Sequence, residues 1–291
     1  MAITGGDRKR KGGTLYVSDL DGTLLDERSL VPAGSRDILS RLVRDRGLLF
    51  TVATARTQAT VVRLMDGIGA PLPYIVMNGA AMWDASSGRY TCVQPIPENT
   101  VQQLCEAYER RGVHPFVYRD NRGVIDAFHH SNTTTTERDF IAERTGTPYK
   151  RFILCATPYT PNGDPALIIF STGEYAVLEQ IYGDIISSGI ACHAVCYHDI
   201  YSTGGGILEV YAPGVSKAAA VTRLKEQAGA KRLVVFGDNL NDREMMAIAD
   251  HSVAVENAVE ELKVTASEVI GPNTADSVAR WIENDINSNG A

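Results

Sequence analysis

Three short and mostly apolar runs, each followed by polar residues, mark the outer parts of the chain. They cover residues 15–18, 48–53 and 233–236, and they lead into Asp19, Thr54 and Asp238. Runs of this kind are typical of parallel strands that are covered on both faces. Apolar residues at helical spacing lie between them, over residues 36–45, 57–67 and 217–228. Strands that alternate with helices predict an α/β fold with a doubly wound parallel sheet.

The middle of the chain has a different pattern. A fourth strand at residues 74–77 leads into Asn78 and Gly79, and a helix is predicted at residues 98–111. Residues 116–118 and 124–128 flank the turn sequence Asp-Asn-Arg-Gly of residues 120–123, which predicts a β-hairpin. Further predicted elements are strands at 152–155, 166–170, 192–197 and 207–211, and a helix at 174–187. We therefore expect a flexible tail at residues 1–13, a parallel-sheet domain from residues 14–82 and 213–291, and an inserted α+β domain at residues 83–212.

Composition and charge narrow the range of functions. The 291 residues are 44% hydrophobic and 22% charged, which excludes disorder for most of the chain. The net charge of −7 argues against a nucleic-acid partner, despite the basic run at residues 8–11. No apolar run has the length of a membrane helix, so we expect no membrane partner. Five scattered cysteines and the lack of an export signal favour reduced thiols in the cytoplasm.

The first candidate for chemistry is the acidic sequence Asp19-Leu20-Asp21-Gly22-Thr23, directly after a predicted strand. Ligands of open parallel sheets bind beyond the carboxyl ends of the strands. Two carboxylates at this edge can divide the work, since one can attack an electrophile while the other moves protons. Gly22 permits the sharp turn that follows the strand. Taken alone, the same sequence could equally be an acidic surface turn.

Three further segments carry matching chemistry. Residues 237–242 follow another predicted strand and contain Asp238, Asn241 and Asp242, whose oxygens suit a hard cation such as Mg²⁺. Thr54 ends a third strand, and Lys217 stands at the start of a helix, where it can neutralise phosphate charge. Four such features in one chain indicate a common site rather than separate turns.

Together these motifs resemble those of the haloacid dehalogenase superfamily, the phosphohydrolases with an aspartate nucleophile, and within it the Cof-type, sugar-phosphatase-like branch. The resemblance covers residues 15–80 and 214–255. Residues 19–23 are similar to the family's first motif, Thr54 to the second, Lys217 to the third and residues 237–242 to the fourth. It implies a parallel-sheet core with a large cap inserted between the second and third motifs.

The resemblance also implies roles for individual residues. Asp19 would be the nucleophile that forms an aspartyl-phosphate, and Asp21 would be the general acid/base. The Asp19 carboxylate, the Asp21 carbonyl and Asp238 would hold Mg²⁺, while Asp242 would orient the magnesium shell and Lys217. The residues that would bind the phosphoryl group are Thr54, Lys217 and Asn241.

Contacts with the rest of a substrate are less well defined by the sequence. Ala55 stands where the family usually has glycine, and a positive φ there would be strained. Arg56 could face the substrate or lie exposed at the start of a helix. The other candidate substrate contacts are Asn78, Gly79, Tyr118 and Arg122, with His129, His130 and residues 133–136 as further candidates. Those in the inserted domain could equally be solvated hairpin or loop residues.

The expected function is a Mg²⁺-dependent phosphatase that hydrolyses small phosphorylated metabolites, with sugar phosphates as the first choice. The alternatives are a phosphatase for pyridoxal phosphate or nucleotides, a phosphotransferase or mutase, and an inactive sensor of phosphorylated metabolites. The intact set of Asp19, Asp21, Lys217 and Asp238 argues against the sensor. The expected partner is a small phosphomonoester, and the expected state is a monomer or a homodimer.

Overall fold

The computed structural model describes residues 13–131, 133–155, 163–199 and 203–289, so the predicted tail lies outside it except for Gly13. The chain divides into two compact units. The first consists of Met1–Thr54, Leu64–Ile75 and Lys217–Ala291, and the second of Ala55–Arg63 and Val76–Ser216. The second unit thus contains residues 55–63, 76–82 and 213–216, which the sequence analysis assigned to the parallel-sheet domain.

The first unit is built on a five-stranded sheet in the order β14-β13-β12-β1-β2. All its neighbouring strands are parallel. Its strands are β1 (Thr14–Ser18), β2 (Leu49–Val52), β12 (Arg232–Gly237), β13 (His251–Val255) and β14 (Glu268–Ile270). The predicted parallel α/β fold is confirmed. Strands β1 and β12 both lie inside the sheet, which explains why their residues are mostly apolar.

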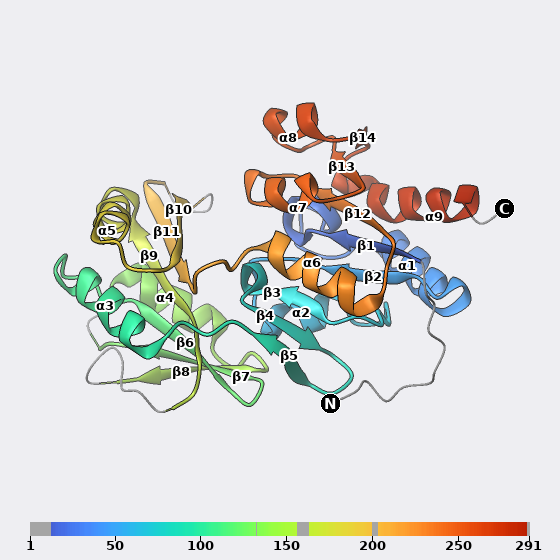
Figure 1. Ribbon diagram of the computed structural model, residues 1–291. Helices are drawn as coiled ribbons and strands as arrows, with labels where there is room; N and C mark the ends of the chain where they lie inside the picture. Colours follow the sequence, from blue (N-terminus) through green and yellow to red (C-terminus); the bar gives the residue numbers. More distant parts are fainter. Residues whose placement is uncertain (1–12, 132, 156–162, 200–202, 290–291) are drawn as a thin grey trace. The chain divides into compact units, whose positions relative to one another are not determined.

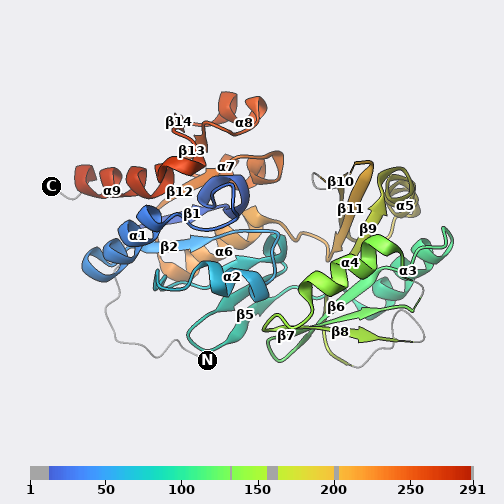
Figure 2. The same ribbon diagram turned by 180° about the vertical axis from the view of Figure 1, so that it is seen from behind.

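Helices cover both faces of this sheet. They are α1 (Ala33–Arg46), α6 (Lys217–Ala228), α7 (Arg243–Ala247), α8 (Glu260–Thr265) and α9 (Ser277–Asn289), while α2 (Gln58–Leu64) crosses the division between the units. Helix α6 lies in front of the sheet in Figure 1, and α1 and α9 lie in front in Figure 2, which is the reverse view. Helix α1 buries Leu39 and Leu42 and ends at Gly47, whose φ of 60° suits glycine.

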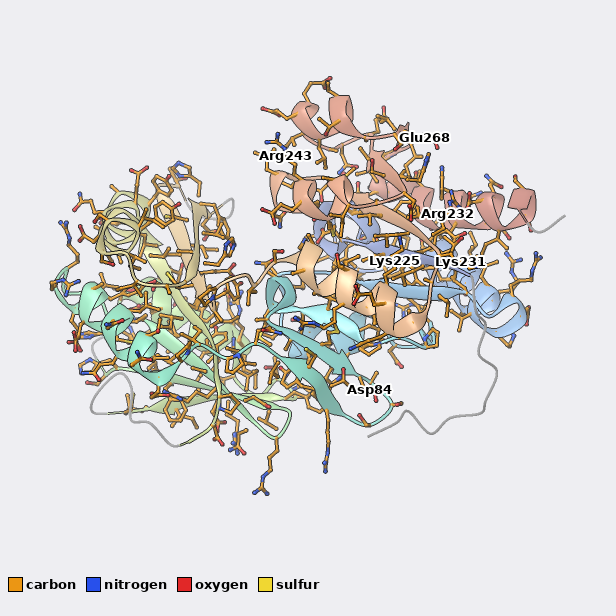
Figure 3. All side chains as sticks on the ribbon, viewed as in Figure 1. Asp84, Lys225, Lys231, Arg232, Arg243 and Glu268 are labelled. Atoms are coloured by element: carbon orange, nitrogen blue, oxygen red, sulfur yellow. The ribbon has the colours of Figure 1, made fainter. Side chains whose placement is uncertain are left out.

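Ion pairs hold the amino-terminal side of this sheet. Arg232, the first residue of β12, binds Asp285 at 2.5 Å, and Lys225 binds Asp250 at 2.8 Å. Figure 3 labels both cations. These charges have partners at the end of the strands opposite to Asp238, so they stabilise the scaffold rather than form part of a site.

The second unit is built on a six-stranded sheet in the order β10-β11-β9-β6-β7-β8. Its strands are β6 (Phe116–Asn121), β7 (Val124–His129), β8 (Lys150–Leu154), β9 (Ala166–Glu174), β10 (His193–His198) and β11 (Gly205–Tyr211). The predicted hairpin is confirmed, since β6 and β7 pair antiparallel with Asn121 opposite Val124. Strands β7 and β8 are parallel, and the other neighbours are antiparallel.

Helices also cover both faces of this second sheet. They are α3 (Glu98–Glu109), α4 (Thr135–Arg144) and α5 (Tyr175–Ser188). Helices α3 and α5 lie in front in Figure 1, whereas α4 lies in front in Figure 2. Of the candidate contacts at residues 133–136, Thr134 caps α4 and residues 135 and 136 begin it: the Thr134 side chain accepts from the Glu137 N–H, and the Glu137 side chain accepts from the Thr134 N–H.

A small sheet of β3 (Tyr74–Val76), β4 (Ala81–Asp84) and β5 (Arg89–Val93) completes the described structure. Trp83 on β4 is 1% exposed, and its ring meets the rings of Tyr90 and Tyr149 edge to face. The tryptophan is therefore a packing residue of the second unit.

Candidate active site

The carboxyl ends of β1 and β12 bring the acidic motifs of the first unit together. In the parallel register Ser18 lies opposite Phe236, and the Asp19 N–H donates to the Phe236 carbonyl at 3.0 Å. Asp19 follows β1 directly and Asp238 follows β12 directly. Two segments more than 200 residues apart in sequence thus supply carboxylates to one edge of the sheet, as the sequence predicted.

A buried lysine binds two carboxylates at this edge. The Lys217 Nζ donates to Asp19 Oδ1 at 2.6 Å and to Asp242 Oδ1 at 2.7 Å. All three side chains are at most 7% exposed. Burial lowers the pKa of Lys217, but the charges of Asp19 and Asp242 outweigh this effect and hold the pKa above its usual value. The ammonium therefore stays charged beside Asp19.

Asp242 is fixed by the turn that follows β12. Its Oδ2 accepts from the N–H groups of Asp238 at 3.1 Å and Asn239 at 3.2 Å, while its Oδ1 binds Lys217. Gly237 makes this approach possible, because a Cβ there would lie 2.7 Å from the Asp242 Cβ. Both oxygens of Asp242 are occupied by donors, so this side chain is suited to positioning Lys217 and the backbone of Asp238.

Gly22 brings the first motif close to Asp238. Its φ is +79°, and a Cβ at this position would collide with the Asp238 carboxylate, lying 2.8 Å from Cγ. The Thr23 hydroxyl donates to Asp238 Oδ1 at 2.8 Å, which leaves Oδ2 as the oxygen that faces Gly22. The glycine is therefore needed both for the turn and for the position of this carboxylate.

The charges of this cluster fit a divalent cation. One carboxylate oxygen each from Asp19, Asp238 and Asp242 lie within 4.8 Å of one another, with a single ammonium among them. Burial raises the pKa of Asp19 well above its usual value; Lys217 opposes this rise, and Asp242 adds to it. Burial and the charge of Asp242 raise the pKa of Asp238 to about 6. Such excess negative charge, carried on oxygen, is the environment that Mg²⁺ prefers.

The other residues predicted for this site lie at the same edge with fewer described contacts. Asp21 is exposed, and it is close enough to raise the pKa of Asp238 by its charge. Thr54 is buried after β2, with its N–H bonded to the Ile75 carbonyl at 3.0 Å. Asn241 is exposed in the turn of residues 240–242. The roles of these three residues stay predictions.

The substitution at position 55 is compatible with the backbone. Ala55 is not among the described non-glycine residues with positive φ, which include Asn78 and Arg122. An alanine is therefore not strained at this position.

Several of the predicted substrate contacts lie in the second unit. Asn78 and Gly79 both have positive φ, of 52° and 96°, in the tight turn after β3. The Asn78 amide donates to Glu209 Oε2 at 3.2 Å and to the Tyr211 hydroxyl at 3.1 Å. Arg122 is exposed at the tip of the β6–β7 hairpin. For these three residues a role in substrate binding stays a prediction.

Tyr118 lies in a different environment from the solvated hairpin position that the sequence also allowed. It is 3% exposed in β6 and lines a cavity of about 260 Å³ within the second unit. Arg56 lines the same cavity, so the structure brings two of the candidate substrate contacts together. The other side chains of the lining include Thr57, Phe140, Arg144, Lys150, Phe170 and Glu209.

Sequence analysis missed most of this lining because its residues belong to no motif. Glu209 is a single charged residue within β11, whereas Lys150 begins β8 and is followed by Arg151; the burial of both depends on which sheet face they occupy. The only signal in the sequence is a charged residue inside an otherwise apolar strand, as in Ile207–Tyr211.

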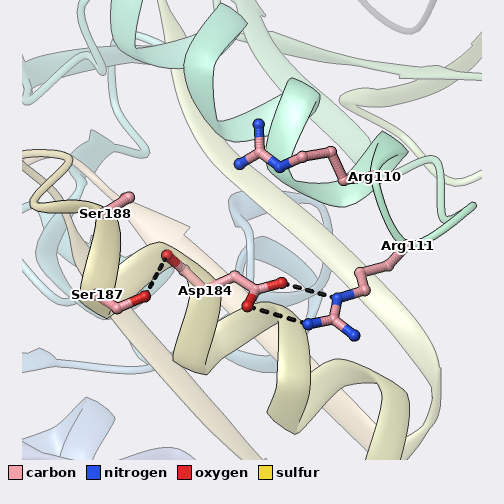
Figure 4. A pocket seen from close by; sticks show the side chains of 5 residues that line it. All are labelled: Arg110, Arg111, Asp184, Ser187 and Ser188. Carbon is pink, nitrogen blue, oxygen red and sulfur yellow. Dashed lines mark hydrogen bonds and ion pairs between the residues drawn. The ribbon is translucent and has the colours of Figure 1, made fainter.

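A larger hollow of about 430 Å³ lies on the surface of the second unit (Figure 4). It is lined by Arg110, Arg111, Asp184, Ser187 and Ser188. The Arg111 guanidinium binds both oxygens of Asp184, at 2.8 and 3.1 Å, which satisfies the charge of that carboxylate. This hollow is open and already ion-paired, so it is a weaker candidate than the carboxylate cluster or the buried cavity.

Comparison with known proteins places these motifs in a family. A family model described as haloacid dehalogenase-like hydrolase matches residues 16–282. The 5-amino-6-(5-phospho-D-ribitylamino)uracil phosphatase YitU of Bacillus subtilis is 25% identical over 284 residues, covering 92% of this chain and 96% of the relative. The pyridoxal phosphate phosphatase YbhA of Escherichia coli is 27% identical over 270 residues, covering 91% and 95%.

Solved structures agree on the fold. A haloacid dehalogenase-like hydrolase from Bacteroides thetaiotaomicron has a TM-score of 0.73 at 21% identity, covering 94% of this chain and 99% of that chain.

No helix in the described part of the chain is both long and apolar enough to cross a bilayer.

Proposed function

The chain belongs to the haloacid dehalogenase-like hydrolases, and from this premise we propose that it is a Mg²⁺-dependent phosphatase of small phosphorylated metabolites. The observation that carries the proposal is the buried Asp19–Lys217–Asp242 arrangement beside Asp238. It presents a carboxylate at a strand end with one oxygen held by a cation, beside an excess of negative charge that suits a metal. The two curated relatives described above are both named phosphatases of phosphorylated small molecules, which supports the proposal.

In the proposed reaction, Asp19 is the nucleophile. Lys217 holds Asp19 Oδ1, so the other oxygen attacks the phosphorus while the bond to the leaving oxygen breaks. Asp21 donates a proton to that oxygen, and an aspartyl-phosphate remains on Asp19. Asp21 then takes a proton from water, the water oxygen attacks the phosphorus, and the Asp19 carboxylate is released with inorganic phosphate.

The remaining residues of the edge hold the phosphoryl group and the metal. Thr54, Lys217 and Asn241 bind the phosphoryl oxygens. The Asp19 carboxylate, the Asp21 carbonyl and Asp238 hold Mg²⁺, and Asp242 keeps Lys217 in place. When bound, Mg²⁺ supplies positive charge that offsets the charge of the phosphate dianion.

The substrate class is open within this proposal. Sugar phosphates, pyridoxal phosphate and nucleotides are candidates, and a phosphotransferase or mutase would use the same first step. A role as an inactive sensor is less well supported, because a sensor needs only to bind phosphate and not the aligned Asp19 and Lys217. Hydrolysis is favoured over a long-lived phosphoenzyme, because Asp21 can act as a base beside the aspartyl-phosphate.

The proposal is tested with a panel of phosphate esters, with and without Mg²⁺, on the wild type and the Asp19→Asn variant. We expect chelation with EDTA to abolish phosphate release and added Mg²⁺ to restore it. Asp19→Asn should lower kcat at least about 1,000-fold, because an amide is a poor nucleophile. Asp45→Asn, at an exposed carboxylate of the same unit, is the matched control and should keep wild-type rates. Hydrolysis that survives exhaustive chelation, or an active Asp19→Asn variant, would contradict the proposal.

A further inference from the structure

The turn after β1 is held firmly at its two ends and less firmly between them. Asp19 is 5% exposed at one end, and Thr23 is 1% exposed at the other, where its hydroxyl donates to Asp238 Oδ1 at 2.8 Å. Between them, Asp21 is exposed and Gly22 is only partly buried. The direction of the Asp21 side chain relative to Asp19 and Asp238 therefore depends on the conformation of the glycine that follows it.

An asparagine from another part of the first unit binds this glycine. Asn257 lies in the turn after β13, and its Nδ2 donates to the Gly22 carbonyl at 2.7 Å. Its Oδ1 accepts from the Asn273 N–H at 3.0 Å. One partner can only accept and the other can only donate, so the two ends of the amide cannot be exchanged. An aspartate of the same shape would lack the donor that Gly22 requires.

The turn that carries Asn257 also binds the other acidic motif. Two residues further on, the Val259 N–H donates to the Asp238 carbonyl at 2.9 Å. The same short segment thus contacts Gly22 through a side chain and Asp238 through the main chain. These two residues lie very close together, because a Cβ on Gly22 would lie 2.8 Å from the Asp238 Cγ. The segment therefore sets the spacing between the two motifs.

Gly22 needs such a contact because its backbone is free to move. Glycine takes positive and negative φ about equally well, and Gly22 has φ +79° and ψ −8°. Since the peptide group is planar, a bond to the Gly22 carbonyl fixes the orientation of the peptide that joins it to Thr23. A hydrogen bond between exposed groups contributes little to stability, so the main effect of this bond is on orientation.

From these contacts we propose that Asn257 is a positioning residue for Asp21. The inference rests on the proposed function, in which Asp21 donates a proton to the leaving oxygen. Asn257 holds the Gly22 carbonyl, and Gly22 in turn sets the direction of the Asp21 side chain. Loss of the Asn257 amide should therefore impair proton transfer more than the attack by Asp19. The defect should grow with the need of the leaving group for a proton.

Two esters with the same ring separate these effects. Phenolate needs a proton on departure much more than 4-nitrophenolate does. At saturating Mg²⁺, Asn257→Ala should lower kcat/KM about 30-fold for phenyl phosphate and no more than about threefold for 4-nitrophenyl phosphate. Asn257→Asp, which places an oxygen against the Gly22 carbonyl, should change the ratio of the two values at least as much. This ratio comes from one sample, so it does not depend on how much of the protein is folded.

A neighbouring asparagine provides the matched control. The Asn273 side chain donates to the Leu25 carbonyl at 2.6 Å, so it makes the same kind of bond to the same turn, but beyond Thr23. Asn273→Ala removes this bond and keeps the main-chain N–H that Asn257 accepts from. Both alanine variants should lower Tm by about 3 °C, the effect of one hydrogen bond. Only Asn257→Ala should change the ratio of the two esters by more than about twofold.

A double variant tests whether the effect passes through Asp21. Once Asp21→Asn has removed the acid, adding Asn257→Ala should change the ratio less than about twofold. The inference is wrong if Asn257→Ala slows both esters equally, leaves both unchanged, or changes the ratio as much in the Asp21→Asn background. The proposed function stands in each of these cases. A wild type that releases phosphate from no ester overturns the proposed function and this inference with it.

Discussion

Replacement of Lys150 by methionine is expected to make the protein more stable at neutral pH. Lys150 is 8% exposed, and its Nζ donates to the Tyr118 hydroxyl at 2.8 Å. Methionine has a similar length and volume, so the cavity wall is preserved, but the buried ammonium is removed. Replacing a buried, unpaired charge with an apolar side chain is commonly stabilising, because the charge had to leave water without a partner.

The size of the effect follows from the pKa of Lys150, which falls from 10.5 to about 7. At about 1.4 kcal/mol for each pKa unit, a protonated Lys150 costs the folded state on the order of 4–5 kcal/mol at pH 7. The variant loses the hydrogen bond to the Tyr118 hydroxyl, about 1 kcal/mol, and the contacts of the ammonium with the rings of Tyr118 and Phe140, about 1–2 kcal/mol. A net gain of about 2 kcal/mol in the free energy of unfolding remains.

The sign of the pH dependence is fixed by proton binding. Between pH 7 and 10.5 the unfolded chain holds a proton on Lys150 that the folded protein has lost, so the wild type becomes more stable as pH rises. From pH 7 to 9 the wild type should gain about 2 kcal/mol relative to Lys150→Met. The two proteins should therefore be about equally stable near pH 9, because the titrations that they share cancel in the comparison.

Urea unfolding followed by tryptophan fluorescence measures this difference. The chain has two tryptophans, and a Trp281→Phe background leaves Trp83, which lies in the second unit with Lys150. Unfolding curves at pH 7, 8 and 9 give the free energies for both proteins. If Lys150→Met is less stable than the wild type at pH 7, or if the difference does not change with pH, Lys150 is a well-solvated structural cation and the reasoning fails.

Two further substitutions test the geometry of the candidate active site. Gly22→Ala should lower kcat/KM about 100-fold, because its Cβ displaces the Asp238 carboxylate. The control Gly229→Ala, which has a similar φ and open space around it, should keep the wild-type kcat/KM. Unchanged kinetics for Gly22→Ala would refute this reasoning. Ala55→Gly should leave kcat/KM within about twofold, since φ is not positive there, and a large gain would show that the alanine strains the phosphate site.

The parallel sheet and its acidic edge could be predicted from the sequence because both depend on short segments. The run before Asp19 and the run before Asp238 are mostly apolar, which is typical of strands covered on both faces. Polar residues at the ends of such strands meet at one edge, so the proximity of Asp19 and Asp238 followed from the fold class. That Lys217 contacts both Asp19 and Asp242 is known only from the structure, because the spacing of these residues in the sequence does not give the distances between their side chains.

The cavity of the second unit could not be predicted in the same way. Which face of a strand is buried depends on the register with its neighbours, and a shift of one residue exchanges the two faces. Lys150 faces Tyr118 across β7, whereas Arg151, the next residue, binds Asp126 at 2.7 Å. The β4–β5 hairpin and helix α4 were also missed, because their sequences lack a strong apolar period.

The central claim is that Asp19 becomes phosphorylated, and trapping the intermediate tests it most directly. Asp21→Asn should slow the attack of water, while acetyl phosphate, whose leaving group needs no proton, still phosphorylates the enzyme. Acid quenching during turnover, borohydride reduction and peptide mass spectrometry then locate the acyl phosphate as homoserine. We predict homoserine at position 19, and none in the Asp19→Asn/Asp21→Asn double variant. Homoserine at another aspartate, or active turnover with no reduced aspartate at all, would contradict the account.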